Sequence, residues 1–145
     1  MKTSAHIIAL CLVLLGCRDF KEYELDEHSF RADTLKKVQK ESGINLPASC
    51  KGLKYHYIPP VDPIVFAKIL IPAESGKVME QYIAGLTNSL ADFPNNFANE
   101  RCQWWPSSPQ NVIVSRKAFN GVYYIEAYLI REKERLILYL KYFTI

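Results

Sequence analysis

Few residues of this 145-residue chain have the types and spacing that catalysis requires. His28 and His56 follow the N-terminal apolar segment, and neither is spaced from a second histidine or a cysteine in the way that metal ligands are. His56 could act as the base for a cysteine nucleophile, but nothing marks a thiol as activated. Some carboxylates could form a glycosidase pair if the fold brought two of them together: Asp62, Glu74, Glu80 and Asp92.

Larger catalytic motifs are missing from the sequence. It has no paired-histidine metalloprotease helix, no glycine-rich loop that would cradle phosphates and no nucleophile elbow. A formal net charge of +3 at pH 7 is too balanced for a nucleic-acid-binding protein, which needs a clustered basic face. The sequence therefore predicts no catalytic residue, no metal site, no cofactor and no nucleic-acid partner.

A pair of tryptophans in a long connection is a candidate binding site. Trp104 and Trp105 fall in residues 91–110, which lack the apolar period of a helix or strand, and connections of this length are often functional. The two side chains could present a recognition patch for a protein, a glycan or a lipid surface, with Arg101 on its polar rim. Alternatively, they pack beside Cys102 and close one end of the core.

The N-terminus has the pattern of an export signal. Lys2 precedes nine consecutive apolar residues, Ile7 to Leu15, and charge returns at Arg18 and Asp19. A helix that crosses a bilayer needs roughly 20 apolar residues, whereas the core of a signal peptide needs about 7–15. The segment therefore predicts a signal peptide and not a membrane span.

The residues that end this segment are Leu14-Leu15-Gly16-Cys17. They resemble the lipobox of bacterial lipoproteins, in which an aliphatic, a variable and a small residue precede a cysteine. The resemblance implies that residues 1–16 are cleaved off and that lipid on Cys17 anchors the protein to a membrane. In such lipoproteins an aspartate directly after the cysteine favours the inner membrane. Arg18 stands there instead, which favours the outer membrane, with the protein facing the periplasm.

The same resemblance accounts for two of the four cysteines. Cys11 would leave with the signal and Cys17 would carry lipid, so Cys50 and Cys102 remain. An even pair in an oxidising compartment predicts a disulfide, with two buried free thiols as the alternative. Closing a loop of about 50 residues would stabilise the fold by roughly 4 kcal/mol on the chain-entropy account.

The rest of the chain predicts one small α+β domain. We expect a charged tether over residues 17–29 and a single domain over 30–145, in the order α-β-β-α-β-β-β. Gly43 favours the end of the first helix, and Asn120-Gly121 is typical of a hairpin turn. Two helices should cover an antiparallel sheet of about five strands. The helices are expected at about 30–42 and 75–89, and the strands at Leu53–Ile58, Ile64–Ile71, Asn111–Arg116, Val122–Arg131 and Arg135–Phe143.

The last two strands each have an apolar face and a mixed face. The mixed faces combine tyrosine with Glu126 and Lys141, which is typical of a half-exposed surface. Tyr124, Tyr128 and Tyr139 on these faces could anchor a partner. They could also be ordinary strand formers on a solvated face.

Three classes of function fit these features. The first is a non-enzymatic accessory lipoprotein that binds a protein partner in the cell envelope. The second is an immunity or inhibitor lipoprotein that neutralises a toxin or a wall-degrading enzyme. The third is a minor hydrolase, which would need carboxylates clustered in a pocket.

Overall fold

The computed structural model describes residues 21–59, 61–87 and 98–144. Cys17, the expected signal peptide and Asp92 lie outside these residues. Within them, no helix is both long enough and apolar enough to cross a membrane. Export and lipidation therefore stay predictions.

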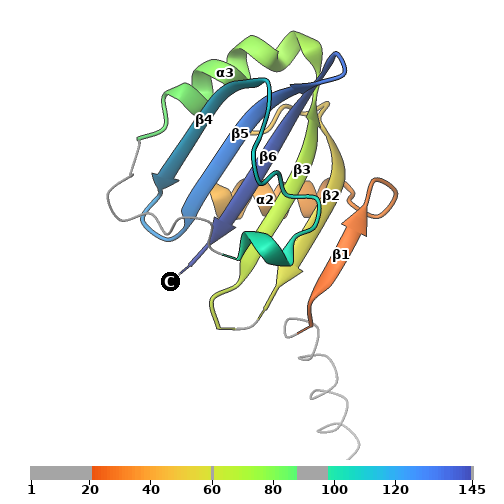
Figure 1. Ribbon diagram of the computed structural model, residues 1–145, viewed down its shortest axis with the longest axis vertical. Helices are drawn as coiled ribbons and strands as arrows, with labels where there is room; N and C mark the ends of the chain where they lie inside the picture. Colours follow the sequence, from red (N-terminus) through yellow and green to blue (C-terminus); the bar gives the residue numbers. More distant parts are fainter. Residues whose placement is uncertain (1–20, 60, 88–97, 145) are drawn as a thin grey trace, which may run out of the picture.

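Six antiparallel strands form one sheet in the order β1-β2-β3-β6-β5-β4 (Figure 1). Two α-helices lie behind this sheet in Figure 1, and the stretch that contains the short helix η3 crosses its front. The strands are β1 (Tyr23–Asp26), β2 (Lys51–Ile58), β3 (Ile64–Ile71), β4 (Val112–Phe119), β5 (Tyr124–Glu132) and β6 (Arg135–Phe143). The helices are α2 (Ala32–Ser42) and α3 (Gly76–Ala84), with the single 3-10 turns η2 (Ala73–Ser75) and η3 (Asn99–Arg101).

The predicted α+β class is confirmed, but the sheet has one strand more than expected. The extra strand, β1, lies in the segment assigned to a tether, so the order becomes β-α-β-β-α-β-β-β. Glu24 of β1 pairs with His56 of β2, and the Tyr23 ring lies 5.3 Å from that of Tyr57. The strand has only four residues and lies at the edge of the sheet. Its four residues, Tyr-Glu-Leu-Asp, alternate too briefly within a charged segment for the sequence to indicate a strand.

The helices differ from expectation at one end. α2 ends at Ser42, and Gly43 adopts the predicted left-handed conformation with φ of 72°. α3 ends at Ala84 and not near residue 89, because Gly85 follows it as the C-terminal cap. A glycine within the predicted helix thus marks its end.

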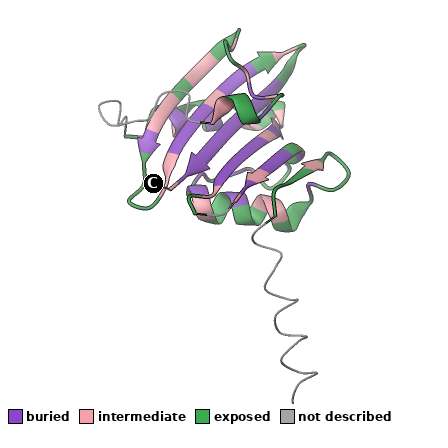
Figure 2. Cartoon of the chain, turned by 60° about the horizontal axis from the view of Figure 1, so that its bottom comes forward, coloured by how far each residue is buried: buried purple, intermediate pink, exposed green. Residues whose placement is uncertain are grey.

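The core on the helix side of the sheet follows the predicted alternation. Leu136, Leu138, Leu140 and Tyr142 of β6 are buried there with Ile125 of β5. Figure 2 shows buried residues concentrated in the central strands, whereas the edge strand β4 is largely exposed or partly exposed. Apolar burial of this kind is the main stabilising contribution to a fold of this size.

The opposite face of the sheet is a second core, which corrects the prediction of a half-exposed surface. Tyr139, Lys141 and Phe143 of β6 are all buried, and Glu126 of β5 is buried beside them. This face is buried because a segment distant in the sequence covers it. Residues 98–111, here called the strap, run across this face and place Cys102 and Trp105 in the same buried cluster (Figure 1).

Candidate functional site

Trp105 fixes the strap to the middle of the sheet. Its ring centroid lies 5.2 Å from that of Phe66 in β3 and 6.0 Å from that of Tyr139 in β6. The ring is 5.8 Å from Tyr128 in β5, and the ammonium group of Lys141 lies 5.5 Å from its centroid. Trp105 therefore packs inside the protein and does not offer its ring to a partner.

One row of residues beneath the strap crosses all six strands. The strand register places these residues side by side, and all of them lie on the same face because successive side chains of a strand alternate between faces. Every member of the row except one phenylalanine has an ionisable side chain. In sheet order it is Glu24, His56, Phe66, Lys141, Glu126 and Lys117.

The centre of this row is a buried ion pair. The Lys141 ammonium lies 2.5 Å from a carboxylate oxygen of Glu126 and donates a hydrogen bond to the Asn99 side chain at 2.7 Å. Tyr128 donates a hydrogen bond to the other carboxylate oxygen, and Lys117 lies 3.9 Å from that same atom. Burial lowers the pKa of Lys141, and the Glu126 carboxylate opposes that shift.

His56 anchors the other end of the strap. One nitrogen of its buried ring is 2.7 Å from Glu22, and the other is 3.4 Å from Glu24. Glu22 also accepts a hydrogen bond from Arg101 of the strap at 2.9 Å. The hydrogen bond with His56 holds the pKa of Glu22 below its usual value. His56 and Arg101 thus meet at Glu22, which links β2 and the residue before β1 to the strap.

An open groove of about 490 Å³ lies between the end of the strap and the β5–β6 turn. Arg131, Lys133 and Arg135 line it, together with Pro106 and Pro109 of the strap. The Arg131 amide donates a hydrogen bond to the Asn111 carbonyl at 3.1 Å, which fixes the strap against this end of β5. We call this open groove the cationic groove.

Glu132, the acidic residue in the lining of the cationic groove, is already paired with Lys68. Lys68 donates to both carboxylate oxygens of Glu132 at 3.0 and 3.3 Å, and Tyr139 donates at 2.5 Å. Burial alone would raise the pKa of Glu132, but these hydrogen bonds hold it below its usual value. Glu132 is therefore ionised and neutralised by Lys68. The charge available to a ligand comes from Arg131, Lys133 and Arg135.

The expected disulfide between Cys50 and Cys102 is absent, and both cysteines are free. Cys50 packs against the core on the helix side of the sheet, whereas Cys102 is buried in the core under the strap. Burial raises the pKa of Cys102 to about 12 and also raises that of Cys50. Neither thiol is activated as a nucleophile.

The residues proposed as an aromatic binding patch do not form one exposed surface. Trp105 and Tyr139 are buried, while Trp104, Tyr124 and Tyr128 are half-buried. Arg101 is exposed and paired with Glu22. The cationic groove was not predicted, although basic residues at alternate positions across a turn were a visible signal: Arg131, Lys133 and Arg135.

Comparisons with known proteins assign no family. No family model, no curated protein and no solved structure matches the chain. In the part of the chain that the structure describes, no group of three His, Cys, Asp or Glu side chains could hold a metal ion. The cationic groove combines three basic side chains with one carboxylate that is already paired.

Proposed function

We propose that this protein is a lipid-anchored, non-enzymatic binding module of the bacterial cell envelope, and that its cationic groove captures an acidic segment of a partner protein. The observation that best supports this proposal is the charge of the groove. Three cations line it, and its carboxylate is neutralised by Lys68. Charge complementarity of this kind steers a partner and fixes its register.

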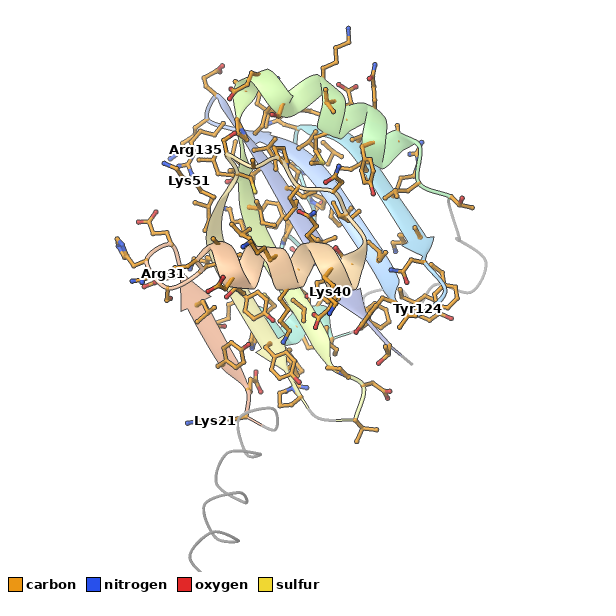
Figure 3. The ribbon with its side chains drawn as sticks, turned by 180° about the vertical axis from the view of Figure 1, so that it is seen from behind. Lys21, Arg31, Lys40, Lys51, Tyr124 and Arg135 are labelled. Carbon is orange, nitrogen blue, oxygen red and sulfur yellow. The ribbon has the colours of Figure 1, made fainter. Side chains whose placement is uncertain are left out.

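The position of the groove suits an anchored protein. In Figure 3, Lys21 lies at one end of the molecule, and Arg135 and Lys51 lie toward the other. Cys17 precedes Lys21 by four residues, so a lipid on Cys17 would hold Lys21 within about 14 Å of the membrane surface. The groove would then face the periplasm, where a partner can reach it.

The burial of the reactive groups favours binding over catalysis. Lys141, His56 and Cys102 are all covered by the strap or by neighbouring strands. A general base must come within hydrogen-bond reach of its substrate, and no substrate can approach these side chains while the strap is in place. A nearby groove of about 380 Å³ mixes Asp26 and Glu27 with Lys54 and so favours no single ligand charge.

Lipidation is tested by a pair of matched cysteine variants. We expect Cys17→Ser to block cleavage of the precursor and to move the protein out of the detergent phase in a phase-partitioning assay, because the acyl chains supply nearly all the membrane affinity. Cys11→Ser, which alters the signal peptide but not the acylated thiol, should leave both properties unchanged. Unaltered processing and partitioning of the Cys17→Ser variant would refute the anchor.

The groove is tested by charge reversal at its rim. We expect Arg135→Glu to weaken the binding of a fluorescent oligoglutamate peptide by about tenfold or more, with the wild-type affinity falling as salt is raised. Lys40→Glu, an equal charge reversal on the exposed surface of α2, is the control and should have little effect. Equal losses in both variants would mean that net charge and not the groove binds the peptide.

A further inference from the structure

Exposed apolar side chains gather at the end of the sheet where β1 begins. The register places the start of β1, the β2–β3 connection, the β4–β5 turn and the end of β6 at this end. Figure 3 shows Lys21 and Tyr124 there, opposite Arg135. Of the six large apolar residues that are exposed in the described part of the chain, four belong to this end: Val61 at 84% exposure, Val122 at 62%, Phe119 at 44% and Tyr23 at 36%.

The β4–β5 turn holds Val122 outward on a rigid support. The Asn120 side chain accepts hydrogen bonds from the amides of Val122 and Tyr123 at 3.0 and 2.8 Å. The same side chain donates to the Ser42 carbonyl of α2 at 3.2 Å, which fixes the turn to the helix. Gly121 permits the turn through its φ of 97°. Val122 is therefore held in its exposed position by a hydrogen-bonded turn.

The charges at this end are compatible with a lipid surface. Lys21 and Lys40 both lie toward it in Figure 3, and cations of this kind attract anionic headgroups. Opposing charges at the same end come from Asp62, Glu22 and Glu41. A single exposed apolar side chain needs no explanation, but four at one end, beside the point where the chain leads to Cys17, form a pattern that does.

We propose that this end of the domain, here called the near end, rests on the membrane surface and inserts Val61 and Val122 into the headgroup region. The inference rests on the proposed lipid anchor, because a tether of about 14 Å at full extension keeps the near end within reach of the bilayer. Burying exposed apolar side chains in the interface then favours one orientation of the domain over free tumbling. In that orientation the cationic groove points away from the lipid.

Photocrosslinking from the bilayer tests this orientation. The mature lipoprotein is reconstituted in phosphatidylcholine vesicles that contain a lipid with a diazirine at the headgroup boundary, and crosslinked peptides are mapped by mass spectrometry. We expect the segments around Val61 and Val122 to crosslink about tenfold more than the β5–β6 turn, in line with burial of apolar surface at one end.

Two matched variants test whether the near end contacts the membrane independently of the lipid anchor. Val61→Asp with Val122→Asp should reduce crosslinking of both turns to the level of the β5–β6 turn while the protein still floats with the vesicles. Val78→Asp, at a similarly exposed valine of α3, should leave the pattern unchanged. A wild-type protein that floats but crosslinks evenly overturns the near-end contact alone. A protein that does not float overturns the anchor and the contact together.

Discussion

Replacing Glu126 by glutamine is expected to lower the free energy of unfolding by about 3–5 kcal/mol, since it leaves the fully buried Lys141 ammonium without its counter-charge. A domain of this size is stable by only about 5–15 kcal/mol, so the loss would be large. Chemical denaturation followed by circular dichroism measures it. The variant Glu27→Gln removes an exposed carboxylate that lies 3.8 Å from His28 and should change stability by less than about 0.5 kcal/mol.

The same variant should acquire a characteristic pH dependence. Burial lowers the pKa of Lys141 in the folded state, and Glu126 opposes that shift. Without the carboxylate the folded pKa falls further below its unfolded value, so the unfolded state binds more protons. The stability of Glu126→Gln should therefore rise more steeply than that of the wild type as pH increases from neutral toward the unfolded lysine pKa.

A double variant separates the ion pair from simple packing. Glu126→Gln combined with Lys141→Met removes both charges from the buried site, and we expect it to be more stable than Glu126→Gln alone. A single Glu126→Gln variant within about 1 kcal/mol of the wild type would contradict the assignment of a buried, charged Lys141.

Replacing Trp105 by alanine is the second change with a large expected effect. Its ring packs against Phe66, Tyr128 and Tyr139, and its removal opens a cavity beneath the strap. Truncating a buried aromatic residue of this size costs about 3–5 kcal/mol. Thermal and denaturant unfolding, followed by circular dichroism, give the measurement.

Trp104 is the matched control for this prediction. It lies in the same strap, directly before Trp105, but it is only half-buried, and its ring centroid is 6.5 Å from that of Phe66. We expect Trp104→Ala to destabilise the fold by about 1 kcal/mol, well below the effect at Trp105. Equal losses at the two positions would mean that the strap is not held by Trp105 in particular.

The parts of the fold that local pattern determines were predicted well. The alternation in β6, the mostly apolar run of β3, the left-handed Gly43 after α2 and the turn at Asn120-Gly121 all follow from chemistry within a few residues. The end of α3 was not predicted, because the expected helix ran through Gly85, whereas in the structure this glycine caps the helix.

The features that sequence reasoning missed depend on residues far apart in the chain. Lys141 is buried because Glu126 lies opposite it on the next strand and because Asn99 of the strap accepts its hydrogen bond. Neither partner is visible from the pattern around Lys141 itself. The disulfide prediction failed for a related reason: counting cysteines does not show that a sheet separates them.

The outer edge of β4 has a consequence for how many copies one membrane can hold. In the described part of the sheet no strand pairs with this edge, and β4 is rich in apolar residues. Lipid anchoring would confine copies to two dimensions, where neighbours collide often and open edges can join into fibres. A bulge between Val112 and Val114 breaks the regular spacing of that edge, and Arg116 and Lys117 add charge at its centre. Both features oppose such joining, so a densely populated membrane can remain a layer of separate domains.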